Sequence, residues 1–426
     1  MPYAAIERPS IALGLLTAEL RAARIETRAR YANLEFADRV GLPAYQAVLG
    51  SKTALFLGEW TFAAAAFPEM SAIDPEYVAA CAAEIGETPE LLLRVREQAA
   101  QFIADLAASI VAQRPRIVGC TSTFQQHAAS LALLREVHRL DPSIVTMIGG
   151  TNCELQMGMA ARRSFPWIDF VVSGEADDII VPFVRDVLEH GRDAATPRGV
   201  INAAIAGRRD AEPPRASVWS MDSVPTPDYD DYFAALQASP LREAVTPELV
   251  VETSRGCWWG AKSHCTFCGL NGGNMAFRAK SPQRAADDFH TLAARYGVRR
   301  FAAVDNIIDM EYLRTMLPLL AGHGYDIFYE TKANLRRHHM ETFADAGVRS
   351  IQPGIESFHD EILRLLAKGN KAWMNVQLLK WAAELGIVTS WIFLIDVPGE
   401  RDEWYVEMLT WLPLVMHLEP PSFAVP

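Results

Sequence analysis

The chain has 426 residues, of which 50% are hydrophobic and 22% charged, and its formal net charge is −12 at pH 7. This globular composition excludes disorder or a coiled coil as a description of the whole chain. The negative charge disfavours binding to bulk nucleic acid, because an acidic surface repels phosphate groups. The six cysteines are too few for a disulfide scaffold and are typical of a reducing compartment.

The N-terminal sequence MPYAAIERPSIALGLL has no basic segment leading into an apolar core, so a signal peptide is not expected. Apolar stretches such as TALFLGEWTFAAAAF are interrupted by Glu59 and are shorter than the roughly 20 residues of a membrane span. The sequence therefore predicts a cytoplasmic protein with neither membrane nor nucleic acid among its partners.

The first 206 residues alternate short runs rich in Val and Ile with helical patterns. The runs expected as strands are 24–34, 116–123, 143–150, 167–174 and 199–206, and the expected helices include 127–140, 156–165 and 177–190. Strands alternating with helices indicate βαβ units and a doubly wound, Rossmann-like parallel sheet with helices on both faces. A more helical insert is expected at about 42–113.

Six prolines crowd residues 207–247. Proline at this density sustains neither a long helix nor a central strand. We expect a Pro-rich linker here, in which the acidic segment PDYDDYF packs against a domain.

A second βα series runs from residue 248 to residue 426. Its expected strands are 248–256, 299–308, 326–335, 350–357, 390–399 and 422–426, with helical patterns between them, several of which end in Gly as helices commonly do. This series predicts a partial (β/α)6 barrel. The chain is therefore expected to hold two domains, 1–206 and 248–426, joined by the linker.

Three cysteines, Cys257, Cys265 and Cys268, form a C-x7-C-x2-C pattern in the loop after the first barrel strand. Such loops are where barrels build active sites, and thiolates bind iron–sulfur clusters or zinc. A [4Fe–4S] cluster held by three cysteines would leave one iron open to a small molecule. A zinc site normally needs four protein ligands, and the nearest fourth candidate is His264. Clustered but unligated thiols are the third interpretation.

The other cysteines, Cys81, Cys120 and Cys153, are dispersed among apolar neighbours and are expected to be small buried side chains.

Polar side chains follow four successive barrel strands where each strand meets its loop. They are Asp305 and Asn306, Glu330 and Lys332, Glu356 and Ser357, and Asp396. Because the C-terminal ends of barrel strands share one face, these groups are candidates for positioning a cofactor.

In the first domain the strand ends are rich in small residues. They are Gly119–Thr123, Gly149–Thr151 and Ser173–Glu175. Open α/β sheets bind ligands at this edge, and small residues leave room for a flat or extended molecule. Tight βα turns without any ligand are the alternative. The G-x-G-x-x-G fingerprint is absent, which weakens a nicotinamide hypothesis.

The cysteine loop, with the aromatic Phe267 before its last cysteine, resembles that of the radical S-adenosylmethionine (SAM) superfamily. The usual spacing there is C-x3-C-x2-C. The longer first gap, with SRGCWW and CTFCGLNG, is similar to the cobalamin-binding branch known as RiPP (bacteriocin-type peptide) maturation radical SAM protein 1. The resemblance covers nearly the whole chain.

The resemblance implies an enzyme that reductively cleaves SAM at a [4Fe–4S] cluster held by Cys257, Cys265 and Cys268. It further implies cobalamin-dependent C-methylation of a ribosomally synthesised precursor peptide, with an electron donor such as flavodoxin or ferredoxin. Two alternatives stay open: a radical peptide cyclase or rearrangement enzyme without methyl transfer, and a zinc-stabilised peptide-binding protein. Members of this family usually continue further, so we expect a C-terminal extension to be absent from this chain.

For SAM, the expected contacts are Phe267, Asp305, Asn306, Glu330, Lys332, Glu356 and Ser357. Among these, the resemblance places Phe267 near the adenine and Glu356 near the methionine and ribose. For cobalamin, the expected contacts are Thr121, Ser122, Gly149, Gly150, Gly174 and Glu175. No Asp-x-His-x-x-Gly motif occurs in residues 1–206, so the cobalt is expected to receive no histidine from this domain. His127, His138 and His190 are expected to be surface or packing residues.

Overall fold

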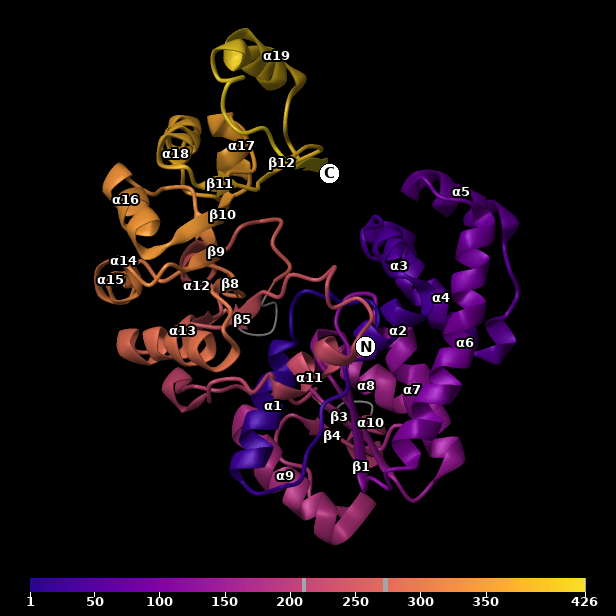
Figure 1. Ribbon diagram of the computed structural model, residues 1–426. Coiled ribbons are helices and arrows are strands. Elements are labelled where there is room, and N and C mark those ends of the chain that lie inside the picture. The colour runs from indigo at the N-terminus through magenta and orange to yellow at the C-terminus, as the bar shows by residue number, and fades with distance from the viewer. Residues whose placement is uncertain (209–211, 271–274, 426) are drawn as a thin grey trace. The chain divides into compact units, whose positions relative to one another are not determined.

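The computed structural model describes residues 1–208, 212–270 and 275–425 (Figure 1). The chain divides into two compact units. The first comprises Met1–Val218 with Pro227–Thr246, and the second comprises Trp219–Thr226 with Pro247–Pro426. The segment expected as a linker, 207–247, is thus divided between the two units.

The first unit is built around a four-stranded sheet. Its strands are β1 (Ile117–Thr121), β2 (Val145–Gly149), β3 (Phe170–Val172) and β4 (Val200–Ile201). Its α-helices are α1 (Ile11–Ala22), α2 (Ala32–Val40), α3 (Leu42–Leu49), α4 (Leu57–Ala66), α5 (Pro75–Ile85), α6 (Pro89–Val111), α7 (His127–Leu140), α8 (Leu155–Ser164), α9 (Asp177–His190), α10 (Ala203–Ala206) and α11 (Asp230–Ala238). Short 3₁₀ turns occur at Thr53–Leu55, Pro68–Met70, Thr151–Cys153 and Gly191–Asp193.

The strand order is β1-β2-β3-β4, and the first three strands are parallel. Thr121 pairs with Gly149, which pairs in turn with Val172, so these three strands end at one edge of the sheet. The last strand, β4, runs antiparallel to β3. The predicted parallel sheet therefore ends in one antiparallel strand.

Helices cover both faces of this sheet, as the sequence predicts. On one face, β2 and β3 pack against α9 in a cluster of buried apolar side chains, which includes Val145, Met147, Phe170, Val172, Phe183 and Val187. Helix α1 extends this layer through Leu20, which packs on Ile180 and Val184. Because strand side chains alternate between faces, the intervening residues point to the other side, where α7 contacts β1 and β2 and α8 contacts β3 and β4.

The helical insert expected at 42–113 is present as α3 to α6, and α4 and α6 both pack on α7. Glu59 in α4 caps α7: its carboxylate accepts hydrogen bonds from the backbone N–H groups of His127 (2.9 Å) and Ala128 (2.6 Å). A carboxylate at this end of a helix satisfies unpaired donors and complements the helix dipole. The acid that interrupts the apolar stretch of α4 therefore fixes the start of α7.

The strand expected at 24–34 is wrong. Residues 25–31 form no regular element, and helix α2 begins at Ala32. Side chains take the hydrogen bonds that a neighbouring strand would take: Ala29 N–H donates to Asp231 (2.7 Å), and the Thr27 carbonyl accepts from Arg21 (3.1 Å). The segment is thus held by contacts with α1 and α11 rather than by a sheet.

The acidic segment PDYDDYF packs, as expected. Its tyrosines, Tyr229 and Tyr232, are fully buried, and the acids Asp228 and Asp231 form ion pairs with Arg21 at 3.1 and 2.8 Å. These contacts join α11 to α1 within the first unit.

The second unit contains a five-stranded parallel sheet in the order β11-β10-β9-β8-β5. The strands of this unit are β5 (Leu249–Val251), β6 (Ser254–Arg255), β7 (Arg278–Ala279), β8 (Arg300–Ala303), β9 (Asp326–Lys332), β10 (Val348–Gly354), β11 (Val388–Thr389), β12 (Ile392–Leu394) and β13 (Phe423–Val425). Its α-helices are α12 (Trp258–Ser263), α13 (Pro282–Tyr296), α14 (Tyr312–Thr315), α15 (Leu317–Leu320), α16 (Arg337–Ala346), α17 (Asp360–Leu365), α18 (Ala372–Leu385) and α19 (Asp402–Trp411). Two 3₁₀ turns lie at Met221–Ser223 and Leu412–Leu414.

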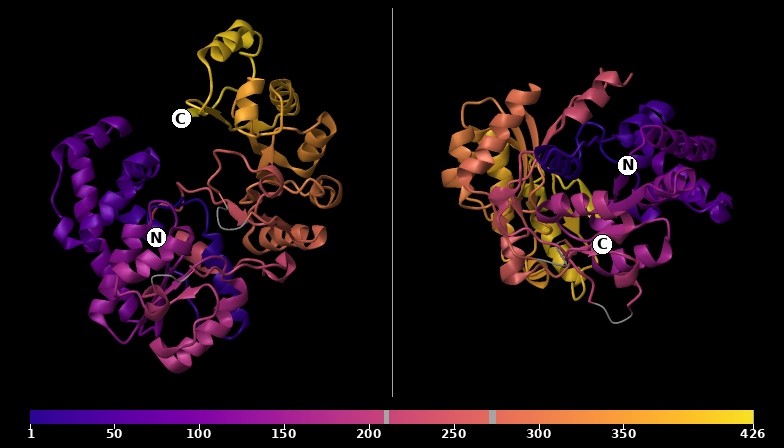
Figure 2. Two further views of the ribbon diagram at one scale, coloured as in Figure 1. Left: turned by 180° about the vertical axis from the view of Figure 1, so that it is seen from behind. Right: turned by 90° about the horizontal axis from the view of Figure 1, so that it is seen from below.

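Each run predicted as a barrel strand overlaps a strand in the described part of the chain; the fifth, 390–399, contains β12, while β11 lies just before it. Helices α13, α15, α16 and α18 lie along one side of the five-stranded sheet (Figure 1). The last strand, β13, pairs in parallel with β12, and α19 lies between them in sequence, beyond β12 in the views of Figures 1 and 2. No helix in the described residues is both long and apolar enough to span a bilayer.

Candidate active site

The cysteine loop begins directly after β6. Cys257 caps the short helix α12, and its Sγ accepts a hydrogen bond from the Gly260 N–H at 3.2 Å. Cys265 and Cys268 lie in the following turn, where the Cys268 N–H donates to the Cys265 carbonyl at 3.2 Å. All three side chains are partly exposed. Cys81, Cys120 and Cys153, by contrast, are buried, as the sequence predicts.

Within the part of the chain that the structure describes, no three Cys, His or carboxylate side chains converge on a point where one metal ion would bind. The thiolates that hold a [4Fe–4S] cube each bind a different iron, so they need not converge on one point. The imidazole proposed as a fourth zinc ligand, that of His264, has its Nε2 3.1 Å from the Cys268 carbonyl oxygen. The donor set of the loop thus fits a cluster held by three cysteines.

The C-terminal end of α17 supports the loop. The Leu365 and Leu366 carbonyls accept from the hydroxyl and the N–H of Thr266 at 3.1 and 3.2 Å, and the Ala367 carbonyl accepts from the Trp259 indole at 3.1 Å. Carbonyl groups at the end of a helix have no partner within it and are free to take such donors. We call residues 365–368 the carbonyl platform.

The Trp259 ring fits closely against Gly369, just after the platform. A Cβ on Gly369 would lie 2.2 Å from the ring, and the backbone there has a positive φ of 66°. The close approach of the ring therefore requires glycine at this position.

Two buried lysines lie beside the loop. The Lys332 ammonium lies 3.8 Å from the centre of the Trp259 ring and donates to the carbonyl of Lys368, the fourth residue of the platform. The Lys368 ammonium pairs with Glu356 at 2.7 Å and lies 5.6 Å from the ring centre of Phe267. The structure thus brings Lys332, Glu356 and Phe267 together, and it adds Lys368 and Trp259 as residues that had no assigned role.

These lysines act on the cysteines electrostatically. Burial raises the pKa of the Cys265 thiol, and the positive charges of Lys368 and Lys332 oppose that rise. Burial and the neighbouring Lys368 charge lower the pKa of Lys332 to about 8. The two lysine charges thus favour the thiolate form of Cys265, but burial outweighs them and its pKa stays raised.

Glu330 shares a face of β9 with Lys332, because residues two apart in a strand point the same way. It is half-buried, and burial, with the Asp305 charge nearby, raises the pKa of its carboxyl to about 6. Glu330 thus lies on the face of β9 from which Lys332 reaches Trp259.

Asp305 lies in different surroundings. It is fully buried and accepts hydrogen bonds from the Thr253 N–H (2.7 Å), the Thr253 hydroxyl (2.5 Å) and the Ser254 hydroxyl (2.6 Å). The Thr253 hydroxyl also contacts the hydroxyl of Tyr329 at 3.1 Å, and Tyr329 points to the opposite face of β9 from Glu330. In this structure Asp305 joins the ends of β5 and β8.

The last two residues expected at the SAM site differ in exposure. Ser357 is fully buried, and its hydroxyl accepts from the His359 N–H at 3.2 Å, next to the start of α17. Asn306 is half-buried in the loop after β8. Ser357, like Asp305, is therefore buried and already hydrogen-bonded within the protein.

Asp305→Asn should remove a pH dependence from the stability of the fold. Burial raises the pKa of this carboxyl from 3.8 to about 6. The protonated carboxyl therefore stabilises the fold below pH 4, and this stabilisation is lost as the pH rises to about 6. The difference in unfolding free energy between wild type and variant should therefore change by about 3 kcal/mol across that window. Urea titrations at several pH values measure it. Asp309→Asn, which alters a carboxylate bonded to the Glu311 N–H, is the control, and an equal effect there would contradict the assignment.

In the first unit, the residues expected at a cobalamin site lie where β1, β2 and β3 end. Ser122 is fully buried, its hydroxyl accepts from the Asn152 amide at 3.0 Å, and it lies 3.0 Å from His127 Nδ1. Because the Ser122 oxygen accepts a hydrogen bond from Asn152, its O–H remains available to donate to Nδ1 of His127. His127 is thus tied to the sheet edge, and burial lowers its pKa. The Ser-x4-His spacing across a strand-to-helix turn is the signal in the sequence that could have indicated this pair.

The small residues at this edge differ in what surrounds them. Gly149 and Thr121 pair with one another at the ends of their strands. Gly150 is exposed, whereas Gly174 forms a parallel bridge with Ala216. Glu175 accepts from the Val218 N–H at 2.7 Å. Gly174 and Glu175 therefore hold the segment that follows β4, while Gly150 packs closely on the backbone of Ser122.

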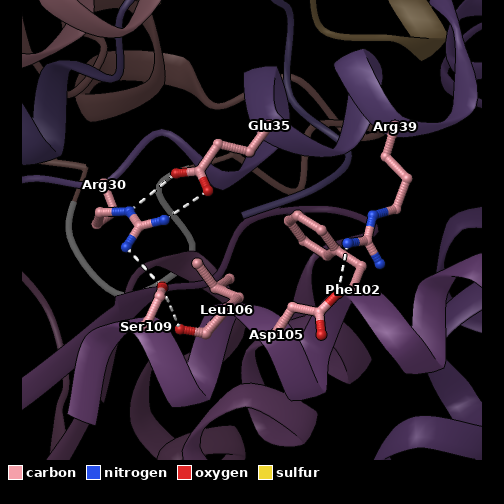
Figure 3. A pocket seen from close by; sticks show the side chains of 7 residues that line it. All are labelled: Arg30, Glu35, Arg39, Phe102, Asp105, Leu106 and Ser109. Carbon is pink, nitrogen blue, oxygen red and sulfur yellow. Dashed lines mark hydrogen bonds and ion pairs between the residues drawn. The ribbon is translucent and has the colours of Figure 1, made fainter. Parts of the chain in front are cut away.

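A separate pocket of the first unit lies between the start of α2 and α6 (Figure 3). It is lined by Arg30, Glu35, Arg39, Phe102, Asp105, Leu106 and Ser109. Its charges pair with one another, because Arg30 binds Glu35 and Arg39 binds Asp105, each at 2.5 Å. The pocket contains none of the residues expected at the two cofactor sites.

Residues 251–412 match the sequence model of the Radical SAM superfamily, and this range contains the cysteine loop, both lysines and the carbonyl platform. Residues 251–412 form a radical SAM domain. The superfamily predicted from the cysteine loop is thus confirmed.

Two curated relatives align with about 70% of the chain. One is described as an uncharacterized methyltransferase of Pyrococcus horikoshii, 25% identical over 70% of this chain and 64% of its own length. The other is the anaerobic magnesium-protoporphyrin IX monomethyl ester cyclase of Rubrivivax gelatinosus, 23% identical over 71% of this chain and 57% of its own. The chain thus covers less than two thirds of either relative.

Solved structures of two enzymes are similar in fold. The cobalamin-dependent SAM radical enzyme OxsB matches with a TM-score of 0.58 and 17% identity over 74% of this chain and 46% of its own. The radical SAM methyltransferase TsrM from Kitasatospora setae matches with a TM-score of 0.58 and 18% identity over 74% of this chain and 63% of its own. The predicted fold, a Rossmann-like sheet domain followed by a partial radical SAM barrel, is confirmed.

Proposed function

We propose that this chain is a cobalamin-dependent radical SAM methyltransferase. The observation that carries the proposal is the cysteine loop, which lies in a radical SAM domain beside the buried Lys332 and Lys368. When bound, the [4Fe–4S] cluster would supply an electron that cleaves SAM to a 5′-deoxyadenosyl radical. The protein's part would be to hold the cluster and to position the molecules around it.

In this proposal Cys257, Cys265 and Cys268 ligate the cluster. The side chains proposed to contact SAM directly are Phe267, Asn306, Glu330, Lys332 and Glu356. Phe267 is 46% exposed and offers an aromatic face, which suits the adenine. Asp305 and Ser357 would support this site through the strand ends that they hold.

The proposed cobalamin site is the strand edge of the first unit. Thr121, Ser122, Gly149 and Gly150 would face the cofactor, and Gly174 and Glu175 would fix the adjoining segment. Two observations support this: these residues lie together where parallel strands end, and the fold is similar to that of OxsB and TsrM, whose structures are described with cobalamin bound.

Histidine ligation of cobalt by the first unit is not expected. The ligand motif is absent, and the Nδ1 of His127, the histidine at this edge, faces the Ser122 hydroxyl. Electron paramagnetic resonance of the Co(II) form checks this. A spectrum without nitrogen hyperfine splitting is expected, and splitting that disappears in His127→Ala would overturn it.

The substrate class proposed is a ribosomally synthesised precursor peptide, on the resemblance of the loop sequences SRGCWW and CTFCGLNG, with flavodoxin or ferredoxin as electron donor. A radical cyclisation without methyl transfer is the second candidate. It is favoured by the similarity to the magnesium-protoporphyrin ester cyclase.

Anaerobic reconstitution of the full chain tests the proposal. Iron, sulfide and cobalamin are added, and SAM turnover is followed with a reductant and a peptide library. Formation of 5′-deoxyadenosine together with a product 14 mass units heavier would support methyl transfer, because CH₂ is the net addition. Deoxyadenosine with a product lacking the added carbon would favour the cyclase. Zinc without iron and acid-labile sulfide would contradict the proposal and favour a peptide-binding protein.

A further inference from the structure

The two lysines beside the cysteine loop carry more positive charge than the protein itself neutralises. Lys332 and Lys368 are only 5% and 7% exposed. Lys368 pairs with Glu356, whereas among the described residues Lys332 has no carboxylate within ion-pair distance. Its ammonium is held instead by the Lys368 carbonyl and the face of the Trp259 ring. One buried positive charge therefore lacks a counter-charge, which is costly in a fold.

This excess charge lies next to the cysteines. Trp259, which Lys332 contacts, is two residues beyond Cys257 on α12. Phe267, next to Lys368, immediately precedes Cys268. The anion that would balance Lys332 is thus expected at the cysteine loop.

A [4Fe–4S] cluster with three thiolate ligands has the negative charge that would balance Lys332. Its net charge is about −1 when oxidised and about −2 after it takes up one electron, and net charge is one of the terms that set a cluster's potential. The oxidised cluster would neutralise the single excess charge of the lysine pair. The reduced cluster would gain further from a fixed cation nearby, because the second negative charge is otherwise poorly solvated there.

We propose that Lys332 is the counter-charge of the iron–sulfur cluster and raises its reduction potential, with Trp259 and the Lys368 carbonyl as the groups that hold it in place. This inference rests on the proposed function. In the step concerned, one electron passes from an external reductant to the cluster, no bond forms or breaks, and no proton moves. Lys332 is a positioning residue in this step, since it acts through its charge on the cluster.

The surroundings of Lys332 fix its ammonium. The indole of Trp259 is bonded to the Ala367 carbonyl, and its ring is in close contact with Gly369. A lysine has a flexible four-carbon stem, which costs conformational entropy to order. The Trp259 ring and the Lys368 carbonyl are thus both fixed at residues 367–369, which keeps the charge in one place before the cluster is reduced.

The test measures the cluster without SAM, because a lysine that serves only a carboxylate of SAM would leave the potential of the cluster alone unchanged. Full-length Lys332→Met, Lys332→Arg and Glu356→Gln are reconstituted anaerobically, and iron and sulfide are assayed. The reduced fraction is then followed by electron paramagnetic resonance at fixed solution potentials. Lys371→Met, which removes a lysine that is paired with Asp360 and mostly exposed, is the matched control.

Lys332→Met should lower the ratio of reduced to oxidised cluster about ten-fold at a fixed potential, and Lys332→Arg should restore it. Glu356→Gln should raise the ratio of reduced to oxidised cluster, because it removes the negative charge that pairs with Lys368 beside the cysteine loop. Lys371→Met should leave it unchanged, since solvent and salt screen an exposed charge. If Lys332→Met fails to hold a cluster, the neutral variant Lys332→Gln replaces it: a lowered ratio supports the inference and an unchanged one overturns it.

The outcome separates this inference from the proposed function. A wild-type chain that binds no iron and sulfide overturns both. A wild-type chain that binds the cluster, with the same potential in Lys332→Met, overturns only the role of Lys332. Weaker SAM binding in that variant at an unchanged potential would instead assign the lysine to SAM.

Discussion

Cys265→Ala should abolish the [4Fe–4S] cluster and reduce 5′-deoxyadenosine formation to background while the chain stays folded. A cube that leaves one iron open for SAM has three thiolate ligands, and losing one leaves a second iron without a protein ligand. The loop itself should persist, because Thr266 binds the Leu365 and Leu366 carbonyls without help from Cys265. Iron and sulfide assays, visible absorption and circular dichroism measure the three effects.

Cys81→Ala is the matched control for this substitution. It also removes one thiol, but from a buried position on α5 in the first unit. It should cost some stability through lost packing and retain iron, sulfide and deoxyadenosine formation. Retention of a full cluster by Cys265→Ala would contradict the assignment of this residue as a ligand.

Gly150→Ala should destabilise the first unit by about 3 kcal/mol and abolish cobalamin binding. The backbone of Gly150 has a φ of 102°, and an added Cβ would lie 2.5 Å from the Ser122 carbonyl oxygen and 2.9 Å from the Ser122 nitrogen. Backbone atoms cannot rotate away as a side chain can, so β1 and β2 would have to separate at the edge proposed for cobalamin. Urea unfolding and a cobalamin absorption titration measure the two losses.

Gly86→Ala isolates the cost of the backbone conformation. Gly86 also has a positive φ, of 72°, but no atom would lie within 4 Å of its Cβ. It should lose only about 1 kcal/mol and bind cobalamin as the wild type does. Equal losses in the two variants would show that strain rather than the collision with Ser122 causes the effect.

Much of the second unit could be predicted from sequence because its strands are buried apolar runs punctuated by turn residues. The predicted run 326–335 contains β9, and the predicted run 299–308 contains β8. The same reasoning failed at 24–34, where the backbone bonds to the side chains of Arg21 and Asp231 and not to a neighbouring strand. An apolar run predicts a strand reliably where the run is buried in a sheet. The prediction fails where side chains, rather than a neighbouring strand, take the backbone hydrogen bonds.

The candidate site was predicted in part. The cysteines were identified because a thiolate cluster needs that residue type at close spacing, whatever the rest of the fold. Lys368 was missed, since it lies in the loop after α17 and meets the cysteine loop only in the folded chain, where its ammonium lies 5.6 Å from the centre of the Phe267 ring. No periodicity in the sequence marks such a residue.

By itself, the sequence determined most of the order of strands and helices in the second unit, the composition that excludes a disulfide scaffold, and the three thiols that can hold a cluster. Only the tertiary structure decided which strand-end side chains lie near those thiols. Lys332 reaches Trp259, whereas Asp305 is bonded to Thr253 and Ser254. The physical reason is that these side chains lie at the ends of different strands, and each is held by residues distant in sequence that only the folded chain brings to it.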